Sequence, residues 1–116
     1  MNNIELEKII SDTQSNPYIK WNNSSLADWC RVDGEFSVYL FNRDGNHGYF
    51  SLLHNLTSKV DGIIVELGNR EGLGILSIYD ALQPDSKFYT LDIVNDNRFI
   101  KNEIKNDPRV NILNDF

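Results

Sequence analysis

Residues 62–92 read GIIVELGNREGLGILSIYDALQPDSKFYTLD, and this stretch decides the fold. It opens with an apolar, β-branched run at 62–67, which is typical of a strand buried on both faces. After a glycine-bearing loop, residues 75–82 carry apolar side chains at helical spacing. Residues 83–86 contain a proline and stop that helix, and 88–91 then form a second strand. The order is therefore strand, helix, strand.

The same alternation continues toward the C-terminus. Residues 96–106 place Phe99, Ile100 and Ile104 on one helical face, and 109–113 read as a third strand. A βαβαβ order predicts a parallel sheet with right-handed crossovers. We therefore expect an α/β fold of the Rossmann-like, three-layer αβα type, of which this chain holds the first βαβαβ half.

The part before residue 59 has a different character, because it is richer in aromatic residues and less regular. It predicts a helix over 3–14, a strand over 35–41 and a helix over about 49–58. Two regions follow from this division. Residues 1–58 form a helical and strand-containing segment that packs on the sheet, and residues 59–116 form the βαβαβ unit.

Composition excludes several classes of protein. A formal charge of -6 with eleven basic and seventeen acidic residues argues against a nucleic-acid partner. No apolar run reaches the roughly 18 residues that a membrane span needs. The lone Cys30 excludes an internal disulfide, and neither His47 nor His54 has partners at metal-ligand spacing. We expect a soluble, cytoplasmic protein with no metal, no membrane partner and no nucleic-acid partner.

The loop at 66–74 is the stretch that points to chemistry, because it connects the first parallel strand to the next helix. Ligands of open α/β sheets bind at the carboxyl ends of the strands, where such a loop lies. Glycine lets the backbone turn sharply and approach a ligand closely. The N–H groups that begin the following helix favour an anionic group.

Glycine spacing separates the ligand classes. A dinucleotide fingerprint G-x-G-x-x-G that starts at residue 68 needs glycines where this chain has Arg70 and Leu73. No G-K-[ST] follows, so the loop is not a phosphate-binding P-loop. The chain instead reads acidic-x-G-x-x-x-G-x-G, with these residues at Glu66, Gly68, Gly72 and Gly74.

Carboxylates follow the two later strands. Asp92 ends the second strand, where a carboxylate can accept hydrogen bonds from both hydroxyls of a ribose. Its distance from the glycine loop also fits a dinucleotide fold, so Asp92 alone does not identify the ligand. Asp115 follows the third strand.

The glycine loop at 66–74, Asp92 and Asp115 follow one another in an order that resembles class I S-adenosylmethionine-dependent methyltransferases. The resemblance extends over about residues 48–116. The runs IIVELGNREGLGILSIYDAL, FYTLDIVNDNRF and DPRVNILNDF are similar to the branch that includes cephalosporin hydroxylase-like and sugar O-methyltransferase-like proteins. The resemblance implies that residues 59–116 are part of an S-adenosylmethionine-binding unit. It also implies methyl transfer to a small-molecule or glycan acceptor.

The resemblance assigns roles to individual residues. Asp92 would hold the ribose, Ile93 would pack on the adenine and Asp115 would face the adenine amino group. The amino acid end of the cofactor would lie on the glycine loop, at Glu66, Gly68, Asn69, Gly72 and Gly74. The bulky side chains of Asn69 and Arg70 depart from the family pattern and need to point to solvent.

The chain supplies only the first strands of the family fold, and the family's catalytic positions follow later strands. We therefore expect the N-terminal piece of a longer enzyme or a truncated gene product, inactive alone. The strand at 62–67 lacks a neighbour on its far edge, and such an edge favours a homo-oligomer. Two alternatives stay open: a non-catalytic module that acts by association, and an NAD-dependent α/β enzyme, which the glycine spacing disfavours.

Overall fold

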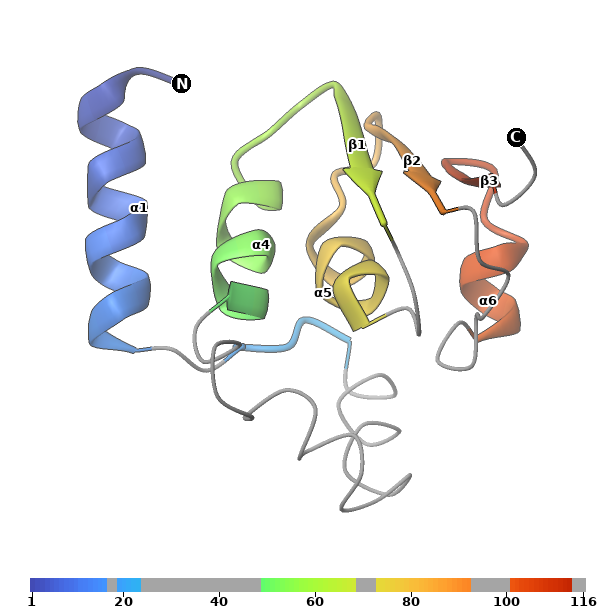
Figure 1. Cartoon of the computed structure of the whole chain (residues 1–116), viewed down its shortest axis with the longest axis horizontal. Coiled ribbons are helices and arrows are strands. Elements are labelled where there is room, and N and C mark those ends of the chain that lie inside the picture. The colour runs from blue at the N-terminus through green and yellow to red at the C-terminus, as the bar shows by residue number, and fades with distance from the viewer. Residues whose placement is uncertain (17–18, 24–48, 69–72, 93–100, 114–116) are drawn as a thin grey trace, which may run out of the picture.

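A computed structural model of the chain describes residues 1–16, 19–23, 49–68, 73–92 and 101–113 (Figure 1). Helices and strands alternate from residue 49 onward. In chain order the elements are α1 (Asn3–Ser15), α4 (Tyr49–Thr57), β1 (Ile63–Leu67), α5 (Leu73–Ala81), β2 (Lys87–Leu91), α6 (Asn102–Lys105) and β3 (Val110–Leu113).

The three strands form one parallel sheet in the order β1-β2-β3. The register runs from Ile63 opposite Lys87 to Leu67 opposite Leu91, and Phe88 of β2 in turn lies opposite Val110 of β3. This confirms the α/β class and the βαβαβ order that the sequence predicts.

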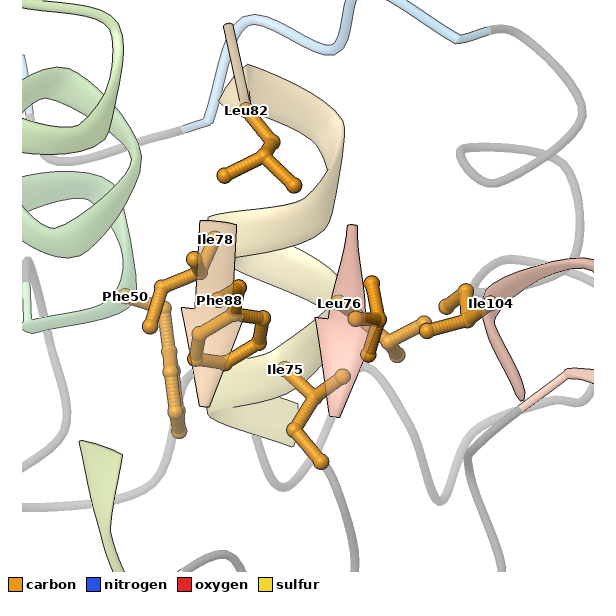
Figure 2. Close-up of a cluster of buried hydrophobic side chains, with 8 residues drawn as sticks. Phe50, Ile75, Leu76, Ile78, Leu82, Phe88 and Ile104 are labelled. Carbon is orange, nitrogen blue, oxygen red and sulfur yellow. The ribbon is translucent and has the colours of Figure 1, made fainter. Parts of the chain in front are cut away.

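The core lies on one face of the sheet, between the strands and the helices (Figure 2). Phe88 at its centre is fully buried, and so are Ile75 and Leu76 of α5 and Ile104 of α6. Burying each such side chain contributes about 1.5–3 kcal/mol. The buried cluster consists of Phe50, Ile75, Leu76, Ile78, Leu82, Phe88, Ile104 and Val110. Helices α4, α5 and α6 therefore all cover the face that carries Phe88.

The prediction that the strand at 62–67 is buried on both faces is wrong. Ile63, Val65 and Leu67 are 69%, 57% and 81% exposed, while Ile64 and Glu66 are half-buried. Side chains alternate between the two faces of a strand, so these three residues share the face opposite the core. No described helix covers that face, and β1 lies at the edge of the described sheet. The third layer of the predicted αβα arrangement is not among the described residues.

The predicted helices agree with the structure where it describes them. Helix α1 ends one residue beyond the prediction, and Asn2 caps it by accepting a hydrogen bond from the Glu5 N–H at 2.9 Å. Helix α6 covers only the end of the helix predicted over 96–106, since 93–100 lie outside the described residues. The strand predicted over 35–41 also lies outside them.

Asp80 of α5 fastens the segment before α4 to the rest of the fold. Its carboxylate accepts the backbone N–H groups of Asn22 and Asn23, each at 2.7 Å, and lies 2.6 Å from His54 Nε2. The Asp80 side chain is fully buried, and Trp21 meets the His54 ring edge-on, with ring centroids 6.3 Å apart. Burial alone raises the pKa of Asp80, but these hydrogen bonds outweigh it and lower the pKa below the ordinary value.

Asp80→Ala tests this attachment. The change leaves His54 and two backbone N–H groups without their buried acceptor, so we expect it to lower the free energy of unfolding by about 3–5 kcal/mol. Urea denaturation measures the loss. Asp85→Ala is the matched control, because Asp85 is exposed in the turn after α5. Equal stability of the two variants would contradict the role given to Asp80.

The pH dependence of stability gives a second test. Asp80 and Asp107 both have lowered pKa values in the folded chain, Asp107 because Arg109 binds it through paired hydrogen bonds at 2.8 and 3.1 Å. A carboxyl whose folded pKa is lowered contributes stability above its unfolded value, and the contribution is lost as pH falls through the folded value. We expect the free energy of unfolding to fall steeply below about pH 4 and less steeply in Asp80→Ala. A stability that is independent of pH in this range would oppose the prediction.

Candidate functional site

The candidate site lies where β1 and β2 end side by side. Their register places Glu66 opposite Thr90, one residue before each strand ends. The ladder continues past β1, because the Gly68 N–H donates to the Leu91 carbonyl at 2.6 Å. Asp92 follows directly after β2 and is buried. The structure therefore brings Glu66, Gly68 and Asp92 to one edge of the sheet.

The Glu66 carboxylate bridges β2 and the start of α5. Thr90 Oγ1 donates to Glu66 Oε1 at 2.7 Å, across the two strands. The other oxygen, Oε2, lies against Gly74 in the first turn of α5, where the helix dipole favours a negative charge. A side chain at position 74 would overlap this carboxylate, since its Cβ would meet Glu66 Oε2 and lie 3.3 Å from Cδ. Glycine at 74 therefore makes room for Glu66.

Gly68 is required for a different reason. Its φ of +87° lies in the left-handed region, which residues with a Cβ rarely adopt. Nothing lies within 4 Å of where its Cβ would be, so space does not demand glycine there. Glycine is needed at position 68 because of the backbone turn at the end of β1. The two described glycines of the loop thus have separate roles, one in turning the chain and one in admitting the carboxylate.

The site is electrostatically negative in the described part of the chain. Burial raises the pKa of Glu66, the Thr90 hydrogen bond opposes this, and the charge of Asp92 raises it further. No Lys or Arg is among the described groups that act on the Glu66 carboxyl. Two carboxylates held close together favour a ligand that brings hydrogen-bond donors or positive charge, and disfavour one that brings phosphate.

A hollow of about 300 Å³ lies beside the strand end, between β1 and α4. Its volume is at the lower end of the range for small-ligand sites. Glu66 and Gly68 line it at one end, and apolar side chains line the rest. The lining residues are Tyr49, Leu53, Leu56, Thr57, Val60, Ile64, Val65, Glu66, Leu67, Gly68 and Ile78.

The remaining predicted site residues lie outside the described part of the chain; they are Asn69, Gly72, Ile93 and Asp115. Their predicted roles stay predictions. Sequence reasoning missed Thr90, whose hydroxyl holds Glu66 in place. The available signal was a hydroxyl residue one position before the end of the second strand, since equal offsets from parallel strand ends meet across the sheet.

The described residues contain no group of three or more His, Cys, Asp or Glu side chains that could hold a metal ion. Within the same residues, no helix combines the length and the apolar character needed to cross a membrane.

No protein-family model matches this chain, and neither a curated protein nor a solved structure matches it. The resemblance to class I methyltransferases therefore depends on the residues of the strand ends and their order along the chain.

Glu66→Gln tests whether the charge of the Glu66 carboxylate lowers the stability of the fold. The raised pKa means that the folded state disfavours the charged carboxylate, so the wild-type chain loses stability as pH rises above 4.5 through the folded value. Glutamine keeps an acceptor for Thr90 without the charge. We expect Glu66→Gln to unfold at higher urea concentration than wild type at pH 7 and to lack this pH dependence.

Glu7→Gln is the control, because Glu7 is exposed on α1 and this change should leave stability unaltered. A lower stability of Glu66→Gln at pH 7 would show that the carboxylate charge serves the fold itself.

Proposed function

We propose that this chain binds S-adenosylmethionine at the carboxyl ends of β1 and β2, as the cofactor-binding part of a class I methyltransferase. On this proposal the α/β sheet is one half of a Rossmann-like, three-layer domain. The observation that carries it is the gathering of Glu66, Gly68, Gly74 and Asp92 at one edge of two adjacent parallel strands. The methyl acceptor is a small molecule or a glycan.

The chemistry of these residues fits the cofactor. S-adenosylmethionine carries two positive charges, on its sulfonium and its ammonium group, against one negative charge on its carboxylate, and its two ribose hydroxyls donate hydrogen bonds. The described end of the site offers the carboxylates of Glu66 and Asp92, and no described cation acts on Glu66. The left-handed turn at Gly68 places backbone without a side chain beside these carboxylates, where a ligand can approach it closely.

Each residue then has a binding or positioning role. Asp92 would accept both ribose hydroxyls and fix the nucleoside, and the backbone at Gly68 would lie against the amino acid end. Glu66 would compensate the positive charge from beside α5, held there by Thr90. The bound cofactor supplies a methyl group on a sulfonium. The contribution of this chain is to hold that methyl group in line with the acceptor, which is the main source of rate in such transfers.

An NAD-dependent enzyme is the second nucleotide-binding candidate for this fold. Its pyrophosphate would bring negative charge close to Glu66 and Asp92, and the loop lacks the dinucleotide glycine spacing. Both features favour the methyl donor over the dinucleotide.

Calorimetric titration with S-adenosylhomocysteine, with NAD as the competing ligand, tests the proposal. We expect micromolar binding of the first and none of the second. Asp92→Ala should weaken binding by about 1.5–3 kcal/mol, roughly 10- to 150-fold, because it removes charged hydrogen bonds to the ribose.

Asp85→Ala is the control for that variant and should bind like wild type, since Asp85 lies in an exposed turn at the other end of β2. Circular dichroism confirms that both variants fold. Unchanged affinity of a folded Asp92→Ala would remove Asp92 from the site, and NAD binding in place of the homocysteine derivative would overturn the proposal.

A further inference from the structure

Thr90 is a polar residue on the apolar face of the sheet. Its side chain is fully buried and lies on the same face of β2 as Phe88, because side chains two residues apart in a strand share a face. A hydroxyl in such surroundings costs free energy unless it is hydrogen-bonded. Valine has nearly the same shape and would fill this space without that cost, so packing does not explain the hydroxyl.

The Thr90 hydroxyl acts across the two strands. The parallel register pairs Thr90 with Glu66, and Thr90 Oγ1 donates to Glu66 Oε1 at 2.7 Å. Glu66 is half-buried, and its other oxygen, Oε2, lies against Gly74 in the first turn of α5. The hydrogen bond from β2 therefore keeps the carboxylate between the strand ends and α5.

The same hydrogen bond affects the charge of Glu66. Burial raises the pKa of Glu66 and so does the charge of Asp92, whereas the hydrogen bond from Thr90 lowers it. Thr90 thus favours the ionised carboxylate in a place where its other surroundings favour the protonated one.

Other titratable groups lie on the elements packed around Glu66. Those described are Lys87 and Tyr89 of β2, Asp92 after it, Tyr49 and His54 of α4, and Tyr79 and Asp80 of α5. His54 is bound to Asp80, and Tyr79 donates to Asp107. Among these groups, Asp92 is the one that acts on the charge of Glu66.

We infer that Thr90 is a positioning residue of the proposed cofactor site: its hydroxyl holds the Glu66 carboxylate in place and in its charged form, so that Glu66 binds the ammonium group of the cofactor. The inference rests on the proposed function, in which the amino acid end lies on the loop beside Glu66 and Asp92 holds the ribose. Because Thr90 is fully buried, it acts through Glu66 without touching the ligand.

Two substitutions separate the hydroxyl of Thr90 from its shape. Thr90→Val removes the hydroxyl and keeps the shape, whereas Thr90→Ser keeps the hydroxyl. Calorimetric titration with S-adenosylhomocysteine at pH 7 measures the affinity. We expect Thr90→Val to bind about tenfold more weakly than wild type, because a charged hydrogen bond no longer holds the carboxylate. Thr90→Ser should bind like wild type.

A shorter ligand distinguishes this role from a purely structural one. 5′-Methylthioadenosine keeps the nucleoside but lacks the amino acid end, so it should bind equally to wild type and Thr90→Val. A variant that only disturbs the fold would lose affinity for both ligands. Thr13→Val is the matched control, because it removes another buried hydroxyl, on α1, and should bind both ligands like wild type.

The pH profile of the affinity is a second readout that a structural role would not move. Binding needs ionised Glu66, so the affinity for S-adenosylhomocysteine falls as pH falls through the folded pKa of this group. Thr90→Val removes the hydrogen bond that lowers this pKa, so its affinity should fall at a higher pH than in wild type. Glu66→Gln should bind weakly without this pH dependence, and adding Thr90→Val to it should weaken binding no further.

The possible failures are distinguishable. Equal binding of S-adenosylhomocysteine by wild type and a folded Thr90→Val, or an equal loss of both ligands in that variant, would overturn this inference alone. No binding of S-adenosylhomocysteine by a folded wild-type chain would overturn the proposed function and this inference with it. If Thr90→Val fails to fold, Thr90→Ala, which also removes the hydroxyl, takes its place with the same expected results.

Discussion

The parallel register that sets Glu66 of β1 opposite Thr90 of β2 is the constraint on which the site depends. It places the Thr90 hydroxyl 2.7 Å from the carboxylate and ends both strands at the same edge, where Gly68 and Asp92 follow. A slip of one residue would move Glu66 to the exposed face of the sheet, because side chains alternate between faces. Ile64 opposes such a slip, since it packs against the core from the same strand face and would leave the core with Glu66.

Local patterns in the sequence predicted the order of elements and the parallel sheet. They also placed Glu66, Gly68 and Asp92 correctly at the strand ends, because a strand end is a local feature and parallel strands align their carboxyl ends. The prediction that β1 is buried on both faces was wrong, since an apolar run does not reveal whether a neighbouring layer exists. The attachment through Asp80 was not predictable, because its partner Asn22 lies 58 positions away in the chain.

The site and the fold make opposite demands on Glu66. Burial and the charge of Asp92 raise its pKa, so keeping the carboxylate ionised lowers the stability of the folded state at neutral pH. Elsewhere the chain places its carboxylates where they stabilise it, as Asp80 and Asp107 do. A charged group that lowers the stability of the folded protein is a common mark of a functional site.

Binding of S-adenosylmethionine at the ends of β1 and β2, as proposed, is best tested by a ¹H–¹⁵N correlation spectrum of the labelled chain, recorded during titration with S-adenosylhomocysteine. We expect the largest shifts on the backbone amides of Gly68, Gly74 and Asp92, with little change in α1. A spectrum of a folded chain that does not change, or that changes only away from these strand ends, would contradict it.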